Sequence, residues 1–172
     1  MKLQYQEDLT LEEKDSLGGI LSCVAHAPPG LGDPVYCKLE AMLAFAMLSL
    51  PATKGFEIGS GFGSARMRGS EHNDPFDLDE QGKIRLATNF AGGTLGGIST
   101  GAPILFKVAF KPTSSIQKPQ ATVNLQGEKA PFQMPETGRH DPCVAIRAVP
   151  IVEAMTALVL ADALLLGRCA KL

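Results

Sequence analysis

The stretch Val149–Leu166, VPIVEAMTALVLADALLL, predicts a helix that is apolar on nearly every side. Its polar side chains do not form one stripe, because at helical spacing Glu153 and Thr156 share a face while Asp162 points the opposite way. A helix of this kind is covered on more than one face. The stretch therefore predicts an element buried inside a layered domain.

A second helix of the same kind is predicted upstream, over Pro34–Ser49. Asp33 can cap its first turn, and a proline at the first helical position costs no hydrogen bond. Pro51 follows the helix and ends it. The second half of this helix is also apolar all round, so the domain needs covering layers for two helices.

Predicted strands supply those layers. Gly18–Ala27 (GGILSCVAHA) is typical of a strand, and Ile104–Phe110 (ILFKVAF) shows the alternation of a half-buried one. Shorter strands are predicted over Thr122–Leu125 and Lys129–Met134. Two wrapped helices and several strands predict an α+β sandwich, taken here as a single domain over residues 1–172. We also expect the helices to bury surface against something additional, either another segment or another subunit.

The charge balance argues against several classes of partner. The 172 residues carry 16 Lys and Arg against 18 Asp and Glu, a net charge of -2, so no overall positive field points to nucleic acid or an anionic membrane. The apolar run around Ile151–Leu166 is interrupted by polar side chains, and we expect it to be too short and too polar to span a bilayer. Met1–Lys14 is polar and acidic, unlike a secretory signal. A cytoplasmic protein is therefore expected.

The cysteines and histidines do not predict a metal site. No cysteine lies two residues from another, as zinc ligands commonly do, so free thiols in a reducing compartment are expected. The cysteines are Cys23, Cys37, Cys143 and Cys169. Structural roles are favoured for His26 and His72, although the carboxylates around His72 leave a metal ligand as the weaker alternative.

Two glycine-rich segments are candidates for binding a nucleotide or another flat ligand. Gly59–Ser64 (GSGFGS) lacks the third glycine of a dinucleotide fingerprint and is followed by a polar segment, so a Rossmann site is not expected. Gly92–Gly97 holds two glycine pairs, which fit either tight turns or a close approach of the backbone to a ligand. Tight turns are the favoured interpretation.

Two further segments carry groups that bind anions. Lys111–Ser115 (KPTSS) follows a predicted strand and offers a cation, hydroxyl groups and backbone N–H groups, which are the parts of a phosphate cradle. A solvated turn explains the same composition equally well. Arg66 and Arg68 would point the same way in an extended segment and could clamp an anion, although a solvated loop is favoured.

Three chemically different side chains stand together in Gly138–Pro150 (GRHDPCVAIRAVP). In an extended segment Arg139 and Asp141 face one side and His140 faces the other. This arrangement suits an anion held by Arg139 beside a carboxylate that acts on the same ligand. A salt bridge between Arg139 and Asp141 is the alternative.

These segments, in this order, closely resemble the C-terminal half of the chorismate synthases, and the resemblance covers nearly all of the chain. The matching stretches are DSLGGILSCV, GLGDPVYCKLEAMLAFAMLSLPATKGFEIGSGF, RMRGSEHNDPF, TNFAGGTLGGISTGAPI, FKPTSSI and GRHDPCVAIRAVPIVEAMTALVLADALL. The most specific of them is GRHDPC followed by RAVP and EAM.

The resemblance implies a lyase of the shikimate pathway, which leads to the aromatic amino acids. Chorismate synthases eliminate phosphate from 5-enolpyruvylshikimate 3-phosphate in an anti-1,4 reaction that gives chorismate. They are flavoproteins that require reduced FMN although the reaction has no net redox change, and some members reduce the flavin with NADPH. The family fold is a β-α-β sandwich, usually assembled as a homotetramer, and this chain would be its C-terminal portion.

The resemblance also implies where flavin and substrate would bind. Arg139 would lie between flavin and substrate, Asp141 would assist proton removal near the flavin, and Arg66 would bind the substrate. The remaining flavin contacts would be Pro51, Ala52, Gly96, Lys111, Pro112, Thr113, Ser114 and Ser115. No metal is implied. Fixed guanidinium groups are needed because the substrate carries one phosphate and two carboxylates.

Two departures from the family pattern bear on activity. His26 stands where relatives tend to have arginine, so a catalytic role for it is even less expected. The family chain is much longer at its N-terminus, and the part without a counterpart here holds the two histidines assigned as acid and base, one of them in an SHG motif. We therefore expect little or no chorismate formation by this chain alone. The alternative is a non-catalytic fragment that at most binds flavin or a partner subunit.

Overall fold

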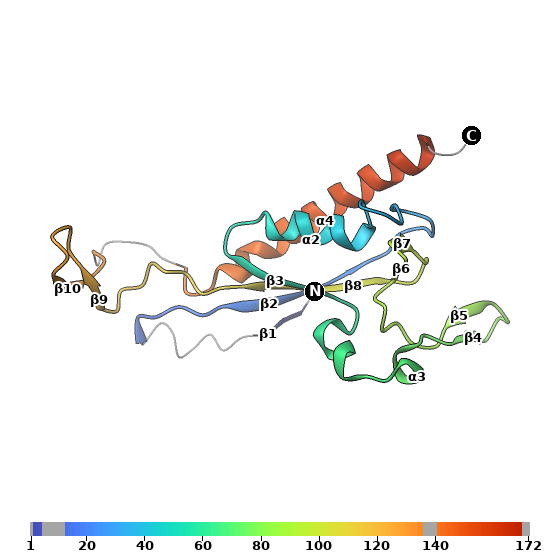
Figure 1. Ribbon diagram of the computed structural model, residues 1–172, viewed down its shortest axis with the longest axis horizontal. Helices are drawn as coiled ribbons and strands as arrows, with labels where there is room; N and C mark the ends of the chain where they lie inside the picture. Colours follow the sequence, from blue (N-terminus) through green and yellow to red (C-terminus); the bar gives the residue numbers. More distant parts are fainter. Residues whose placement is uncertain (1, 5–12, 136–140, 170–172) are drawn as a thin grey trace.

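A four-stranded antiparallel sheet forms the centre of the computed structural model, which describes residues 2–4, 13–135 and 141–169. Its strands, in spatial order, are β1 (Lys2–Gln4), β2 (Gly19–Ala25), β8 (Ile104–Phe110) and β3 (Thr53–Ile58). The helices α2 (Leu39–Leu48) and α4 (Val144–Cys169) lie together on one face of this sheet (Figure 1). The expected mixed fold is therefore present, with one sheet and the helix layer that covers it.

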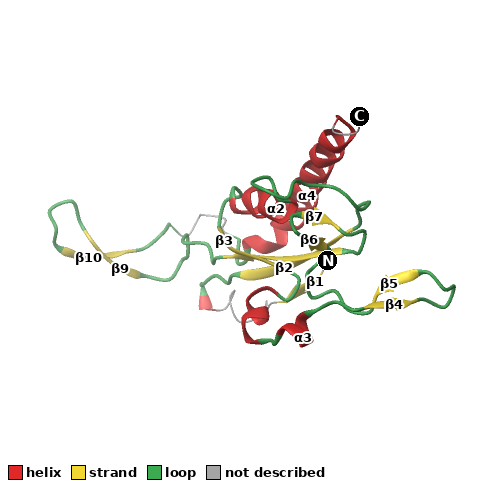
Figure 2. Ribbon diagram, turned by 45° about the vertical axis from the view of Figure 1, so that its right-hand side comes forward, coloured by secondary structure: helices red, strands yellow, loops and turns green. Residues whose placement is uncertain are grey.

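Smaller elements extend from both ends of the sheet. They are the 3₁₀ helix η1 (Gly61–Arg66), the helix α3 (Gly69–His72) and the strands β4 (Phe76–Leu78), β5 (Ile84–Leu86), β6 (Thr94–Leu95), β7 (Ile98–Ser99), β9 (Gln120–Val123) and β10 (Lys129–Phe132). The strands pair as three hairpins, and the β4–β5 and β9–β10 hairpins stand away from the sheet at opposite ends (Figure 2).

Strand β8 has the bounds that the sequence predicts. Its alternate residues Ile104, Phe106, Val108 and Phe110 are buried under the helices. On the other face the Lys107 ammonium pairs with the Glu57 carboxylate of β3 at 2.8 Å. The alternation of residue types along this strand therefore separates the side chains that face the core from those that face the surface. Within the core these side chains meet those of Leu21, Leu43, Met47 and Val152.

Helix α2 begins at Leu39 and not at Pro34 as the sequence predicts. The Asp33 carboxylate accepts a hydrogen bond from the Val35 N–H group at 2.9 Å, which makes a local turn instead of a helix cap. The Leu39 N–H group donates to the Gly97 carbonyl at 2.8 Å. A neighbouring loop therefore satisfies one of the first free N–H groups of the helix.

Helix α4 begins at Val144, ahead of the predicted Val149, and contains Pro150. Its first half packs on the sheet and buries Ala145, Ala148, Val152 and Thr156. Beyond them Leu158 and Leu165 are 65% and 59% exposed. The helix has 26 residues and contains an 18-residue window with a mean hydropathy of 2.0, so it is long and apolar enough to cross a bilayer by length and composition, and the expectation of a run too short and too polar was wrong. The described residues cover one side of its first half and leave most of the apolar window exposed.

The two glycine-rich segments pack against each other. Gly59 has a φ of 57° and lies against Phe90 and Gly92, so that a Cβ atom at position 59 would collide with the Phe90 carbonyl oxygen. Gly92, with a φ of 75°, meets Gly59 in the same way. These glycines allow a close backbone crossing. For Gly92 and Gly93, both at positive φ, the tight-turn interpretation holds.

The Asp74 carboxylate organises the segment that leads into this crossing. It accepts hydrogen bonds from the Thr88 hydroxyl at 2.7 Å, the Phe90 N–H group at 2.7 Å and the Ala91 N–H group at 2.9 Å. Burial raises the pKa of Asp74, but the hydrogen bonds from Ala91, Thr88 and Phe90 together outweigh burial and lower the pKa below its usual value.

Replacing Asp74 by alanine is expected to lower the free energy of unfolding at pH 7 by about 2–3 kcal/mol, because several donors lose a charged acceptor. The native pKa is depressed, so this stability is complete above the unfolded pKa of about 3.9 and is lost as the pH falls through the lower native value. Urea unfolding at pH 7 and at pH 3 should therefore show a smaller difference between wild type and variant at pH 3. Asp162→Ala, at an exposed position of α4, is the control. An Asp74→Ala chain as stable as this control at pH 7 would contradict the prediction.

Candidate functional site

Most of the predicted site residues gather at one end of the central sheet. Gly19 of β2 and Thr53 of β3 both pair with Phe110 of β8. The segments that precede β2 and β3 therefore meet the segment that follows β8. The start of α4 reaches the same end, since the Leu17 N–H group donates to the Pro142 carbonyl at 2.8 Å. We call this region the sheet-end site; its predicted members are Pro51, Ala52, Lys111, Pro112, Thr113, Ser114, Ser115 and Asp141.

Two hydrogen bonds join the separate segments of the sheet-end site. The Lys111 N–H group donates to the Ala52 carbonyl at 2.8 Å. The Thr113 hydroxyl donates to the Asp141 carbonyl at 3.3 Å. Ala52 itself has a φ of 66°, a left-handed conformation that is uncommon for a residue with a Cβ atom. Such strained backbone persists only where the surroundings fix it, and it is frequent at functional sites.

The Asp141 side chain has a partner that the sequence did not suggest. Its Oδ1 atom lies 3.0 Å from Nη2 of Arg147, in the first turns of α4, and the aspartate is 31% exposed. The arginine of RAVP is visible in the sequence, but only the true start of α4 shows that it can reach Asp141. Arg139 and His140 lie outside the described residues. The predicted contacts of Arg139, and its alternative salt bridge with Asp141, therefore stay predictions.

The Lys111–Ser115 loop offers groups that fit a phosphate. Lys111 and Ser114 are exposed and Ser115 is half-buried, so one ammonium and two hydroxyl groups are accessible. An open groove of ≈ 850 Å³ lies between Ser114 and the β9–β10 hairpin. A cation with adjacent hydroxyl donors is the chemistry that holds a phosphate dianion. The loop therefore fits the phosphate end of a nucleotide-type cofactor.

Gly96 and Arg66 lie at the other end of the sheet. Gly96 is in the β6–β7 hairpin, which joins the start of β8 through a hydrogen bond from Leu105 N–H to the Gly92 carbonyl at 3.1 Å. Arg66 closes η1, which follows the Ile58 end of β3. The seven residues of β8 span about 20 Å. Within one chain, Gly96 and Arg66 therefore do not lie at the sheet-end site.

The favoured interpretation of Arg66 and Arg68 as part of a solvated segment holds, and the alternative, an extended anion clamp, is not formed. Arg66 belongs to the 3₁₀ helix η1, and Arg68 directly precedes α3. Both side chains are exposed, as the solvated-loop interpretation requires. Gly96 has a φ of 60°, and a Cβ atom there would meet no described atom within 4 Å. The surface at Gly96 is thus open, and its contact with a flavin stays a prediction.

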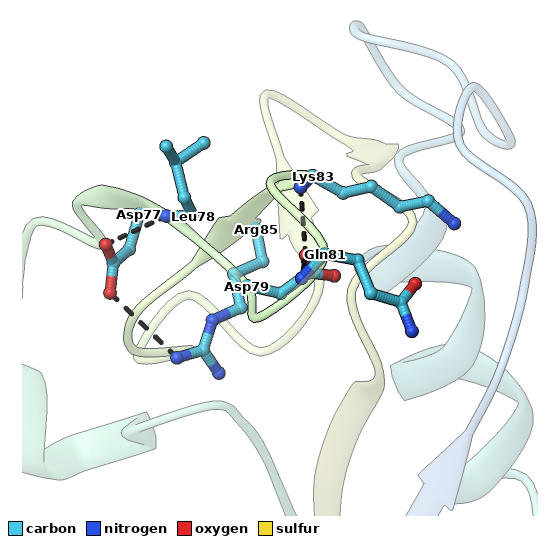
Figure 3. A network of polar contacts seen from close by, with 6 residues as sticks. All are labelled: Asp77, Leu78, Asp79, Gln81, Lys83 and Arg85. Carbon is cyan, nitrogen blue, oxygen red and sulfur yellow. Dashed lines mark hydrogen bonds and ion pairs between the residues drawn. The ribbon is translucent and has the colours of Figure 1, made fainter.

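Polar side chains of the β4–β5 hairpin have structural partners. In the β4–β5 hairpin the Asp79 carboxylate accepts hydrogen bonds from the N–H groups of Gln81 and Lys83, both at 2.9 Å, and Asp77 pairs across the hairpin with Arg85 at 3.9 Å (Figure 3). These contacts form the turn. An apolar cavity of ≈ 700 Å³ beside this hairpin is lined by none of the predicted site residues, so the sheet-end site remains the better candidate.

The contacts of His72 and the burial of Cys23 fit structural roles for these two side chains. The His72 ring lies 3.0 Å from the Ser60 hydroxyl and packs near Phe90. The four cysteines are free thiols, two buried and two exposed. Burial raises the pKa of the Cys23 thiol, which keeps it protonated and unreactive.

Comparisons with family models, with sequences and with solved structures all give the same family. The chorismate synthase family model matches residues 3–165. The chain is 60% identical to the chorismate synthase of Protochlamydia amoebophila over 162 residues, which is 94% of this chain and 44% of that protein. It is 62% identical to the chorismate synthase of Synechococcus elongatus over 154 residues, 89% of this chain and 42% of that one.

A solved structure has the same fold over most of this chain. A crystal structure of a chorismate synthase superposes with a TM-score of 0.70 at 34% identity, covering 92% of this chain and 40% of that one. The described fold is thus that of part of the solved protein. The chain spans less than half of the length of the relatives that it matches.

Proposed function

Because the chain belongs to the chorismate synthase family, we propose that it supplies a cofactor-binding loop and a catalytic carboxylate to a chorismate synthase. The enzyme converts 5-enolpyruvylshikimate 3-phosphate to chorismate and phosphate in the cytoplasm, on the route to the aromatic amino acids. The observation that carries this proposal is the hydrogen bond of 3.3 Å from the Thr113 hydroxyl to the Asp141 carbonyl. It supports the proposal because it brings the Lys111–Ser115 loop against the backbone of Asp141.

The sheet-end site would hold reduced FMN by its phosphate. Lys111 would neutralise part of the phosphate charge, and the hydroxyl groups of Ser114 and Ser115 would donate to its oxygens. Pro51 and Ala52 lie beside Lys111 through the hydrogen bond between Ala52 and Lys111. When bound, the reduced flavin supplies electron density to the reacting substrate. NADPH would serve as the source of reducing equivalents where the enzyme reduces its own flavin.

Asp141 would assist removal of the proton in the elimination. One C–H bond and the C–O bond to phosphate break at opposite ends of a four-carbon unit, a new double bond forms, and phosphate leaves with the C–O electron pair. A carboxylate accepts a proton in such a step when it is ionised and held in place. Arg147, whose Nη2 atom lies 3.0 Å from Oδ1 of Asp141, holds the carboxylate in one orientation. Arg139 would bind an anionic group of this substrate, whereas Arg66, at the opposite end of the sheet, would contact the substrate of another subunit in the homotetramer.

The remaining parts of the enzyme would come from outside this chain. The relatives are more than twice as long as the regions that match it, and α2 and α4 carry exposed apolar residues such as Phe45 and Leu158. Other parts of the family fold, in a homotetramer, would cover these surfaces and provide the acid and base histidines. The second candidate, flavin binding without catalysis, is favoured by the accessible cation and hydroxyl groups of Lys111, Ser114 and Ser115.

The test compares the chain alone with the chain joined to the amino-terminal part of the Protochlamydia amoebophila relative that it does not match. Chorismate and phosphate are measured under anaerobic conditions with reduced FMN. The chain alone is expected to form no measurable chorismate, and the joined protein is expected to form chorismate and phosphate in equal amounts. Turnover by the chain alone at the rate of a complete relative would contradict its dependence on the missing groups. A joined protein that folds, binds FMN and forms no chorismate would favour the non-catalytic fragment.

A further inference from the structure

The segment Asp15–Gly19 (DSLGG), which no predicted role includes, runs between the two halves of the sheet-end site. The Ser16 hydroxyl donates to the Thr113 carbonyl at 2.7 Å. The next residue donates from the Leu17 N–H group to the Pro142 carbonyl at 2.8 Å. Consecutive residues thus hold the anion-binding loop on one side and the segment after Asp141 on the other. We call Asp15–Gly19 the bridging segment.

The bridging segment is packed too closely for side chains at its glycines. A Cβ atom on Gly18 would lie 2.6 Å from the Phe110 carbonyl oxygen and 3.2 Å from the Pro112 ring. A Cβ atom on Gly19 would lie 2.7 Å from the Ala145 Cβ atom in the first turn of α4. The segment therefore contacts both the start of the loop and the start of α4 directly.

Asp15 contributes less than Ser16 to this arrangement. Its carboxylate pairs with the Lys118 ammonium at 3.2 Å, and that lysine is 52% exposed. Exposed pairs of this kind add little stability. Ser16 is half-buried and makes a short hydrogen bond to the loop backbone, so it is the residue of the segment that fixes the loop.

We propose that Ser16 is a positioning residue of the phosphate-binding loop and acts through Thr113. The Thr113 carbonyl is held by Ser16 and its hydroxyl is engaged with the Asp141 carbonyl. With both groups of Thr113 fixed, the hydroxyl groups of Ser114 and Ser115 are presented in one arrangement. Preorganisation of this kind strengthens binding by reducing the entropy lost when the ligand binds. The inference rests on the proposed function, because it takes the ligand of the loop to be the FMN phosphate.

The test compares binding of FMN and of riboflavin, which lacks the phosphate, to the 172-residue chain by flavin fluorescence. The ratio of the two dissociation constants isolates the contribution of the phosphate. Wild type is expected to bind FMN at least about tenfold more tightly than riboflavin, and Ser16→Ala is expected to lose about tenfold in FMN affinity, or about 1.4 kcal/mol. Riboflavin affinity should stay within about twofold, because the hydroxyl acts only on the phosphate loop. Ser16→Thr retains a hydroxyl and should restore FMN binding, and Ser70→Ala, at an exposed position of α3, should behave as wild type.

Each outcome separates the inference from the proposed function. If Ser16→Ala weakens FMN and riboflavin equally, or weakens neither, Ser16 does not position the phosphate loop, while the proposed cofactor remains. If wild type binds both flavins equally, the loop does not hold the phosphate, and both the cofactor site and the role of Ser16 are overturned. If Ser16→Ala fails to fold by circular dichroism, Ser16→Cys takes its place. The cysteine is a weaker donor of similar size, and its FMN preference should fall below that of Ser16→Thr; equal preferences would overturn the role of Ser16.

Discussion

Replacing Asp141 by asparagine lowers the turnover number for chorismate formation by about 100-fold or more in the joined protein, because a positioned side chain that assists proton transfer contributes on the order of 10²–10⁴ to such a step. Asparagine has nearly the shape of aspartate, but its neutral carboxamide is too weakly basic to accept the proton. Flavin binding by Lys111, Ser114 and Ser115 is separate from that carboxylate. FMN affinity should therefore stay within about threefold, as expected for a group that acts in the transition state.

The control for this prediction is the same substitution at Asp162, an exposed position of α4, which should leave turnover within about twofold, as surface changes do. Arg147→Met tests the partner of Asp141, which lies 3.0 Å away. Its loss should be smaller than that of Asp141→Asn, because the carboxylate is still present but less well oriented. Both variants are assayed by initial rates under anaerobic conditions with reduced FMN. An Asp141→Asn enzyme with a turnover number within threefold of wild type would show that Asp141 does not take part in the proton transfer.

Replacing Gly59 by alanine is expected to lower the free energy of unfolding by about 2–5 kcal/mol, the sum of a left-handed conformation and an overpacked contact. Gly59 has a φ of 57°, and its Cβ atom would collide with the Phe90 carbonyl and the Gly92 backbone. Those neighbours are backbone atoms, which cannot move aside as a flexible side chain can. A loss of this size is a large part of the stability of an ordinary domain.

Gly63 provides the matched control for Gly59. It lies in the adjacent 3₁₀ helix η1, and a Cβ atom there would meet no described atom within 4 Å. Gly63→Ala should therefore change the stability by less than about 1 kcal/mol, or raise it slightly. Urea unfolding followed by circular dichroism measures both variants. Equal losses at the two positions would contradict the close crossing of the two glycine-rich segments.

The sequence predicted best the elements whose signal is local. Strand β8 has its expected bounds because Phe106 and Val108 alternate with surface residues, and that alternation needs no knowledge of distant segments. The start of α2 was missed because the Asp33 and Pro34 signals form a turn. The first N–H group of the helix is instead satisfied by Gly97, which is remote in sequence. Helix ends therefore depended on tertiary contacts that the pattern does not contain.

The candidate site could be predicted only in part for the same reason. Composition left Lys111–Ser115 equally consistent with a phosphate cradle and with a solvated turn, and the family resemblance selected the first. The hydrogen bonds that join the loop to Asp141 and to Ser16 cross long sequence distances. The pairing of Arg147 with Asp141 needed the true start of α4. Residue types were therefore predictable, whereas their partners were not.

The order of the strands has a consequence for synthesis of the chain on the ribosome. Strand β8 is hydrogen-bonded on both sides, yet it is the last of the four sheet strands to be translated. After β2 is made, about eighty more residues must be added before β8 can pair with it, which takes roughly 4–16 seconds at about 5–20 residues per second. During that interval Leu21 and Cys23 have no β8 neighbour to bury them. Unpaired strands with exposed apolar side chains are prone to aggregation, so the nascent chain is most exposed to misassembly in that interval.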